Sequence, residues 1–371
     1  MPVSGDQRKN EFDRRAPEGG PIVSYAPGGF SAGRSFWRRL DSYRGLLALI
    51  AVFAAGIVFS PHHQVTGANV FLSPDTQTAM FRRIAEYGIL AAGMTFVILT
   101  GGIDLAVGSV LAMSAMTFTY CLIRQGMPAA AAAGLGVGVG ALSGAVSGII
   151  ISRLRLQPFV VTLAMMVFGR GAARWISNSE KIQAELKMLP GGDFVRARPP
   201  IFTTLGGRLA DPDVPLLGNV FVVTVFFLVI VAAGYILLSR TGFGRRIHAI
   251  GGNELAARYS GINVGLNKTL AYVICGGLAG VAGVLNACQV EMGDPSAGLY
   301  LELDAIAAVV IGGTALTGGE GGMLLTLLGV LIIGYIDTIL SINNVPEAWR
   351  LMSKGMIIVA AVLIQQRRRD S

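Results

Sequence analysis

Charged residues are scarce in this chain. Asp, Glu, Lys and Arg make up 14% of its 371 residues, whereas soluble globular proteins carry about 25%. Apolar residues make up 53% of the chain and fall into long runs without charge. A soluble fold of this length could not cover its surface with so few charges. The composition therefore excludes an ordinary soluble protein and indicates segments whose solvent is lipid.

Cysteine and histidine are rare as well, with three residues of each. The cysteines lie inside apolar runs, at an odd count and without paired spacing, which indicates neither a disulfide framework nor a metal site; they are Cys121, Cys275 and Cys288. An intramembrane enzyme would need a nucleophile with a base, or a metal, among these runs. The inventory predicts no catalytic residue and makes an enzyme the least favoured class of function.

Basic residues exceed acidic ones, giving a formal net charge of +8, and their placement decides what the excess means. Eight of the 30 Lys and Arg lie before residue 45, three lie at 367–369, and five lie between Arg240 and Lys268. Clusters of this kind beside apolar runs are the positive-inside bias of membrane proteins. The placement therefore predicts no nucleic-acid partner.

Ten segments are apolar enough to cross a membrane as helices, which needs about 20 residues each. They are 44–60, 84–101, 104–123, 129–151, 158–175, 219–239, 268–290, 302–316, 323–341 and 348–365. Within two of them, glycines recur at the four-residue spacing that lets helices pack closely, at 140, 144 and 148 and at 276 and 280. We therefore expect an all-α, polytopic membrane protein with about ten transmembrane helices.

Charge asymmetry and alternation across the membrane predict the topology. The amino terminus and the most basic loops lie inside, and five spans lie on each side of the longest outer loop, which raises the hypothesis of an inverted 5+5 repeat. The predicted regions are a disordered cytosolic tail at 1–43, a transmembrane domain at 44–366 with an outer loop at 176–218 and an inner loop at 240–267, and a cytosolic tail at 367–371.

The segment 99–109, LTGGIDLAVGS, puts two adjacent glycines, Gly101 and Gly102, and the carboxylate of Asp104 into an apolar run. Glycine weakens a helix by about 1 kcal/mol, and an ionisable group at membrane depth costs about 2.5–3.5 kcal/mol on insertion scales. We expect a helix break here, with Asp104 either capping the next helix or bordering a water-filled path. A second glycine-punctuated segment contains Gly312, Gly313 and Thr314.

Two acids, Glu302 and Asp304, begin the apolar run that ends at those glycines. Carboxylates favour the amino-terminal end of a helix. Lys354 lies a few residues into the last predicted span, at a similar depth. Because intramembrane charges usually find partners, we expect a structural ion pair between Lys354 and one of the two acids.

The inner loop contains a short helix with its own start and stop signals. Asn253 is a good helix cap, Glu254 suits the first turn, and Gly261 supplies a stop. A helix of about two turns is unstable alone in water, so it lies against either its own membrane domain or a partner, to which Ala256 and Ala257 would offer a small flat face. The predicted coupling residues are Gly252, Asn253, Glu254, Ala256, Ala257, Arg258 and Gly261.

Four segments resemble the ribose-type branch of bacterial ABC-importer permeases. The most specific is GRRIHAIGGNELAARYSGINV in the inner loop, which is similar to the cytosolic coupling segment of that family. LTGGIDLAVGSVLA, QPFVVTLAMM and LELDAIAAVVIGGTALTGG follow the family in the same order. The resemblance covers most of residues 85–365, whereas the first 40 residues and 180–215 do not obviously match it.

The resemblance implies the membrane subunit of an ATP-driven importer for a small sugar, a pentose or a hexose, in the bacterial inner membrane. It implies a second permease subunit, identical or homologous, a pair of cytosolic ATPase subunits and a periplasmic sugar-binding protein. The chain itself lacks a phosphate-binding loop, since GINVGLNKT at 261–269 lacks the glycine before its lysine. We therefore expect no cofactor on this chain and ATP on the partner subunit.

A proton-coupled secondary transporter is the main rival mechanism, with Asp104, Glu302 or Asp304 as the proton carrier. Composition fits that interpretation equally well. It does not account for the capped helix in the inner loop, which an importer driven by a separate ATPase requires.

Overall fold

The computed structural model describes residues 32–64, 67–184, 186–188, 194–196, 199–210 and 220–367. The chain divides into two compact units, Met1–Tyr43 and Arg44–Ser371. In the first unit the described backbone, from residue 32, is helical, so a helix begins within the predicted tail; residues 1–31 lie outside the described part. Parts of the predicted outer loop and residues 368–371 also lie outside it.

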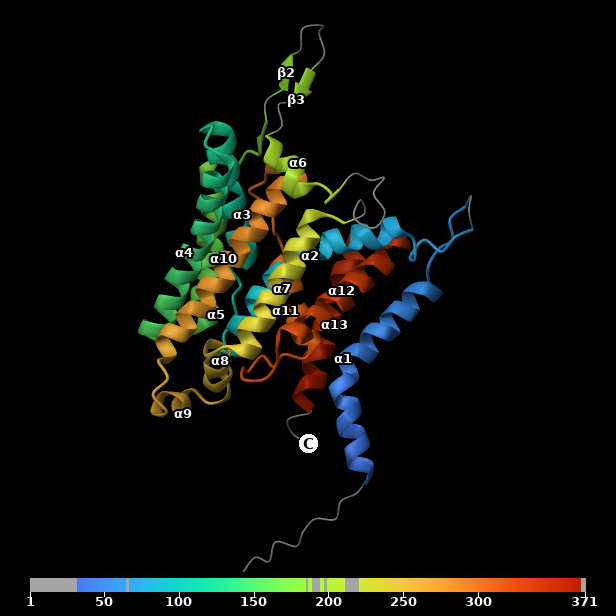
Figure 1. The fold of residues 1–371 in the computed structure, drawn as a ribbon, viewed down its shortest axis with the longest axis vertical. Helices are drawn as coiled ribbons and strands as arrows, with labels where there is room; N and C mark the ends of the chain where they lie inside the picture. Colours follow the sequence, from blue (N-terminus) through green and yellow to red (C-terminus); the bar gives the residue numbers. More distant parts are fainter. Residues whose placement is uncertain are drawn as a thin grey trace, which may run out of the picture. The chain divides into compact units, whose positions relative to one another are not determined.

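Helices make up most of the described chain (Figure 1). Their bounds are α1 Ala32–Val58, α2 Pro74–Leu99, α3 Val107–Thr119 continued by the π-helix η1 Tyr120–Arg124, α4 Ala129–Leu154, α5 Pro158–Ile176, α6 Pro200–Gly206, α7 Val222–Arg240, α8 Gly242–Gly252, α9 Glu254–Tyr259, α10 Val264–Val290, α11 Leu301–Gly312, α12 Met323–Ile342 and α13 Glu347–Arg367. A helix therefore occupies each of the ten apolar segments.

Two short antiparallel strand pairs accompany the helices. Strand β1, Ile182–Gln183, pairs with β4, Met292–Gly293, and β2, Leu186–Met188, pairs with β3, Phe194–Arg196. The first pair joins the loop after α5 to the loop after α10. Lys181 and Asp294 form an ion pair of 2.8 Å beside it. Burial acts to raise the pKa of the Asp294 carboxyl, but hydrogen bonds from Lys181 and from the Ser296 amide help to hold that pKa below its ordinary value.

Six described helices are long and apolar enough to cross a membrane. They are Val107–Arg124, Ala129–Leu154, Pro158–Ile176, Val222–Arg240, Val264–Val290 and Met323–Ile342. Helix α2 is as long, but charged residues interrupt its first half, and α11 has only 12 residues because it ends at Gly312 and not at 316. The chain is thus a polytopic, mainly helical membrane protein.

Helix α2 lies at the centre of the fold and contacts α7, α10, α11 and α12. All its residues from Tyr87 to Leu99 are buried. Beside it, α4 and α10 cross closely: a Cβ atom at Gly140 would overlap the carbonyl of Gly276, and one at Gly144 would overlap the carbonyl of Tyr272. The predicted glycine-mediated packing is confirmed.

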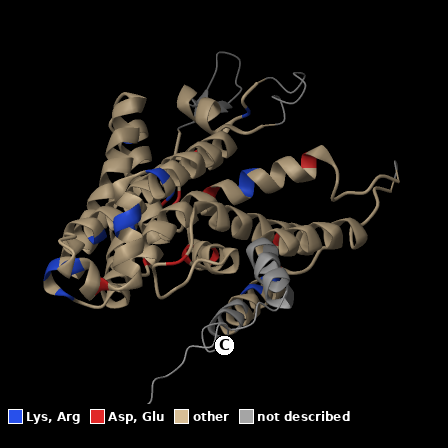
Figure 2. Ribbon diagram, turned by 60° about the horizontal axis from the view of Figure 1, so that its bottom comes forward, with Lys and Arg blue, Asp and Glu red and all other residues tan. Residues whose placement is uncertain are grey.

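The two ends of the helices differ in character. Helices α8 and α9 lie at one end, and α6 with β2 and β3 lies at the other (Figure 1). Few residues along the helices are charged, and Lys and Arg gather near α8 and α9 (Figure 2). Charge is therefore concentrated where the sequence predicts an inner loop.

Candidate coupling site and the glycine segments

The predicted loop helix is present as α9, preceded directly by α8. The side chain of Thr241 caps α8 by accepting a hydrogen bond from the Gly244 amide. The Oδ1 atom of Asn253 caps α9 by accepting a hydrogen bond from the Ala256 amide, over 2.9 Å. At the other end Gly261 has a φ of +82°, which favours glycine. The local start and stop signals thus produce two consecutive short helices.

One face of α9 rests on the protein itself. Ala257 is only 4% exposed and packs with Ile250 of α8 and Val264 of α10. The expectation that Ala257 offers a free face to a partner is therefore wrong for this residue, because the helix turns it towards its own neighbours. Ala256 beside it is exposed.

The free face of α9 carries two large apolar side chains. Leu255 is 64% exposed and Tyr259 is 88% exposed. They are four residues apart, so they lie on the same side of the helix. Sequence reasoning missed both; the signal was an apolar pair at helical spacing in a loop outside the membrane, where exposed apolar groups mark contact surfaces.

Charge fixes α9 to the start of α10. Lys268 donates a hydrogen bond of 2.7 Å to Glu254 Oε2, and Arg258 lies 3.3 Å from Glu254 Oε1. The hydrogen bond from Lys268 holds the pKa of the Glu254 carboxyl below its ordinary value. Glu254 thus pairs with Arg258 one turn along the same helix and with Lys268 of the next helix.

The end of α8 touches two loops inside the membrane domain. The amide of Gly319 donates a hydrogen bond of 3.0 Å to the carbonyl of Leu99. A Cβ atom at Gly318 would lie 2.7 Å from the Gly101 nitrogen, and one at Gly319 would lie 2.6 Å from the Gly252 nitrogen. A Cβ atom at Gly251 would overlap the Leu99 carbonyl. We call these contacts the glycine junction; its residues are Leu99, Gly101, Gly251, Gly252, Gly318 and Gly319.

Backbone conformation also requires glycine at the junction. Gly101, Gly318 and Gly319 have φ values of +78°, +89° and +79°. These values lie in the left-handed region, where a side chain is strained. Gly101, one of the predicted path residues, is thus part of the junction. Gly102 is not: a Cβ atom built on Gly102 would lie 2.5 Å from the hydroxyl oxygen of Tyr272.

Asp104 lies in the turn between α2 and α3 and is 4% exposed. Its Oδ1 atom accepts a hydrogen bond of 2.9 Å from the Ala106 amide, and the thiol of Cys275 contacts the same carboxyl. Ala106 itself occupies the cap position of α3, without a side-chain bond. Asp104 therefore stabilises the turn that precedes the helix.

The second glycine-punctuated segment ends α11. Gly312 is buried against the backbone of Leu325, and Gly313 has a φ of +109°. Thr314 is fully buried, and its hydroxyl accepts a hydrogen bond of 3.4 Å from the Gly322 amide. These residues begin the loop that carries Gly318 and Gly319 to the junction. The structure thus brings the two predicted segments together through Thr317, whose carbonyl lies 3.3 Å from the Cβ position of Gly101.

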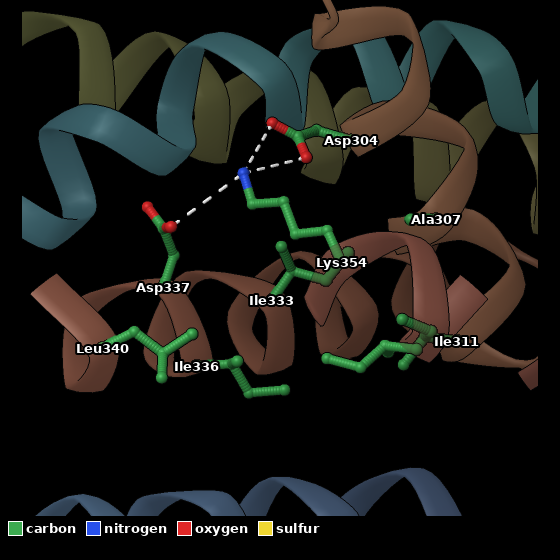
Figure 3. A pocket seen from close by; sticks show the side chains of 9 residues that line it. Asp304, Ala307, Ile311, Ile333, Ile336, Asp337, Leu340 and Lys354 are labelled. Atoms are coloured by element: carbon green, nitrogen blue, oxygen red, sulfur yellow. Dashed lines mark hydrogen bonds and ion pairs between the residues drawn. The ribbon is translucent and has the colours of Figure 1, made fainter. Parts of the chain in front are cut away.

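Lys354 of α13 forms an ion pair with Asp304, near the start of α11; its Nζ atom lies 3.0 Å from Asp304 Oδ1. Asp337 of α12 is a second partner at 3.9 Å (Figure 3) and also pairs with Arg83 and Arg350. Sequence reasoning missed Asp337, because it lies alone in an apolar run. Glu302 takes no part in this cluster: its Oε2 atom is buried without a hydrogen-bond partner among the described residues.

Within the described ranges, no group of three or more His, Cys, Asp or Glu side chains could hold a metal ion. The arrangement instead suits a mechanical task. A loop helix with an exposed apolar pair is joined by charge to α10, and through α8 it meets both interrupted segments of the membrane domain.

Comparison with known proteins identifies the family. Residues 78–362 match the family described as branched-chain amino acid transport system / permease component. The chain is 34% identical over 342 residues to the ribose import permease protein RbsC of Escherichia coli K12, which covers 91% of this chain and 98% of that one. It is 34% identical over 329 residues to the galactofuranose transporter permease protein YtfT of the same organism. The match covers 87% of this chain and 89% of that one.

A third relative is the xylose transport system permease protein XylH of Escherichia coli K12, 32% identical over 357 residues, which cover 85% of this chain and 91% of that one. No solved structure gives a significant match. The matches confirm the resemblance drawn from the four motifs. The chain therefore belongs to this permease family: it is a multi-pass transmembrane subunit of the ABC-importer type and not itself an enzyme.

Proposed function

We propose that this chain is the membrane-spanning permease of an ATP-driven importer for a small sugar, a pentose or a hexose. The relatives named as ribose, galactofuranose and xylose permeases support the substrate class. The observation that carries the mechanism is the glycine junction, because it links α8, on which the exposed loop helix α9 packs, to the interrupted segments of the membrane domain.

The proposed topology has ten spans with both termini in the cytosol. A helix at each of the ten apolar segments supports it, and so do the basic residues near α8 and α9. In this topology 240–267 is the cytosolic coupling loop and 176–218 a periplasmic loop, within a transmembrane domain at 44–366. Five spans on each side of the periplasmic loop keep the inverted 5+5 repeat as part of the proposal.

The proposed assembly sits in the bacterial inner membrane. It contains a second permease subunit, identical or homologous, two cytosolic ATPase subunits that bind ATP, and a periplasmic sugar-binding protein. The family carries no cofactor of its own, so the energy of ATP must reach this chain through contact with another. The path for the sugar runs between the helices, and the lipid surrounds them.

Helix α9 is the proposed point of that contact. Its apolar pair, Leu255 and Tyr259, would enter a groove on the ATPase, as amphipathic helices do in other complexes. Burial of Ala257 and the ion pair of Glu254 with Lys268 make α9 move together with α8 and α10. Because backbone atoms make the close contacts of the glycine junction, with no flexible side chain between them, displacement of α8 reaches Leu99 and Gly318 directly.

The proposal is tested in proteoliposomes that contain the permease, its ATPase and its binding protein. Uptake of labelled D-ribose, D-xylose or D-galactose should require ATP inside the cytosol-equivalent compartment and should continue when a protonophore removes the proton gradient. Uptake that needs a proton gradient and no ATPase would instead support a proton-coupled transporter.

A further inference from the structure

The outer half of α2 is unusually polar for a central helix of a membrane protein. Its second half is buried and apolar, whereas its first half carries four charged residues. Ionisable side chains within transmembrane helices usually pair with groups of opposite charge or border water-filled cavities. The four are Asp75, Arg82, Arg83 and Glu86. Since Arg83 pairs with Asp337, three of them remain to be explained by their surroundings.

These three residues, together with Arg83, line an open cleft of about 440 Å³ between α2, the start of α7 and the end of α10. We call this cleft the outer vestibule. Its polar and aromatic lining includes Asp75, Arg82, Glu86, Arg208, Phe221 and Gln289. A cleft of this size suits a small molecule. Its α2 residues come from the first half of that helix, whose end lies opposite α8 and α9 (Figure 1). This is the periplasmic end in the proposed topology.

Arg82 is held in place on two sides. Its Nε atom donates a hydrogen bond of 3.1 Å to Gln289 Oε1, and its Nη2 atom donates one of 3.2 Å to the Gln289 carbonyl. The guanidinium lies 4.6 Å from the centre of the Phe221 ring. Groups fixed in this way are preorganised for a ligand, because binding does not have to order them.

The same contact leaves Gln289 with an unused donor. Its Nε2 atom is buried and has no hydrogen-bond partner among the described residues. A buried donor without a partner costs about 1–3 kcal/mol. A ligand hydroxyl in the outer vestibule would recover that cost by accepting the bond.

Glu86 offers the complementary acceptor. Asn286 of α10 donates a hydrogen bond of 2.8 Å to its Oε1 atom and so fixes the carboxyl group. The Oε2 atom remains to accept a hydrogen bond from a ligand. The outer vestibule therefore places a donor amide, a donor guanidinium and an acceptor carboxylate around one cleft.

This mixture of groups selects a class of ligand. Three arginines and two acids line the cleft, namely Arg82, Arg83, Arg208, Asp75 and Glu86. Arg83 is already paired with Asp337, so the other four charges balance, which argues against capture of an anion. A polyhydroxyl compound both donates and accepts hydrogen bonds and carries no charge. We propose that the outer vestibule binds the sugar on its way into the membrane domain, with Glu86 and Gln289 contacting its hydroxyl groups; this inference rests on the proposed function.

The test uses the complete importer in proteoliposomes, with labelled D-ribose, D-xylose and D-galactose as probes. Glu86→Gln and Gln289→Leu should each lower the saturated uptake rate about tenfold, the effect of about 1.4 kcal/mol. The binding-protein concentration that gives half-maximal uptake should stay the same. Glu180→Gln is the control, because it removes an exposed carboxylate of the outer loop that does not line the vestibule.

A labelling experiment covers the case in which these variants fail to fold. Ala79 is exposed and lines the cleft, so Ala79→Cys should accept a bulky methanethiosulfonate, and uptake should then stop. The three native cysteines are buried. Thr204→Cys, on the exposed side of α6, should accept the same label with uptake unchanged.

Three outcomes would overturn the inference. Parental uptake in both substitution variants, or after complete labelling at position 79, would show that no sugar passes through the vestibule. A changed binding-protein requirement at an unchanged saturated rate would make the cleft a docking surface. A parent importer that moves none of the three sugars would overturn the proposed function and this inference together, whereas a transporting parent with normal variants would overturn the vestibule alone.

Discussion

The amide of Gly319 donates a hydrogen bond of 3.0 Å to the carbonyl of Leu99 and so joins the loop after α11 to the end of α2. Gly251 of α8 fits against the same carbonyl. Both loops therefore share a backbone contact with α8, and we expect a shift of α8 to displace them together. The predictions below test this relationship and the contacts around it.

Gly251→Ala should block the junction. The added Cβ would overlap the Leu99 carbonyl, and backbone atoms cannot move aside as a flexible side chain can. Overpacking of this kind costs about 1–3 kcal/mol. The measurements are sugar uptake and thermal unfolding, followed with a thiol-reactive dye that reports exposure of the three buried cysteines.

Gly252→Ala is the matched control for that change. A Cβ atom at Gly252 meets nothing within 4 Å, so uptake and unfolding should stay close to those of the parent. Equal behaviour of the two variants would show that close packing at Gly251 has no role in transport.

Leu255→Ala combined with Tyr259→Ala should weaken binding of the ATPase. Alanine preserves the helix while it removes the exposed apolar pair. Loss of an interface anchor typically costs at least about 2 kcal/mol, or more than tenfold in affinity. The measurements are co-purification of the ATPase and its dissociation constant. Leu209→Ala is the control, because it removes an exposed leucine from the predicted outer loop. Unchanged affinity would exclude α9 as the docking helix.

Lys354→Met should destabilise the protein by leaving Asp304 without its cation. Removing one partner of a buried ion pair lowers the free energy of unfolding by up to about 3–5 kcal/mol. The Lys354 and Asp304 side chains are partly exposed, so we expect a smaller loss here. Adding Asp304→Asn should restore the unfolding temperature, whereas Glu302→Gln should not, since Glu302 lies outside the cluster. Rescue by Glu302→Gln would contradict the pairing in Figure 3.

The contact of Glu254 with Lys268 should depend on pH. The hydrogen bond from Lys268 lowers the pKa of Glu254 in the folded protein, so the stabilisation is fully present above the ordinary value of about 4.3. It is lost as the pH falls through the lower folded pKa. The difference in unfolding temperature between parent and Glu254→Gln should thus be constant near neutral pH and shrink below pH ~4. A constant difference throughout would exclude this contribution.

Reporters fused to the chain should read opposite sides of the membrane. One placed after Ser260 should read cytosolic and one near Gly207 periplasmic, because basic residues surround the first site. The pair can be scored by alkaline phosphatase and green fluorescent protein activity. A reversed pair of readings would contradict the proposed topology.

Local features could be predicted from the sequence, because their causes lie within a few residues. The cap at Asn253 and the stop at Gly261 follow from side-chain and backbone preferences. Close packing of α4 on α10 follows from glycine spacing. The pairing of Lys354 with an acid follows from the cost of a lone charge in a membrane, although the choice of Asp304 over Glu302 does not.

Features that depend on distant segments could not be predicted. Burial of Ala257 depends on how α9 packs against Ile250 and Val264, and its own residue type gives no sign of it. The glycine junction joins three stretches that are far apart in the chain, and many other glycines have the same local appearance. Asp337 gathers partners from two other helices, so its role appears only once these helices are placed.

Helix α2 carries the outer vestibule at one end and Leu99, in the glycine junction, at the other. Evolution can therefore change the solute by substitutions in the first half of α2 while the junction, whose closest contacts admit only hydrogen as a side chain, stays fixed. Permeases for different solutes should then share these glycines and differ around positions 82, 86 and 289. The same junction contacts would then couple ATP hydrolysis to transport in permeases whose solutes differ.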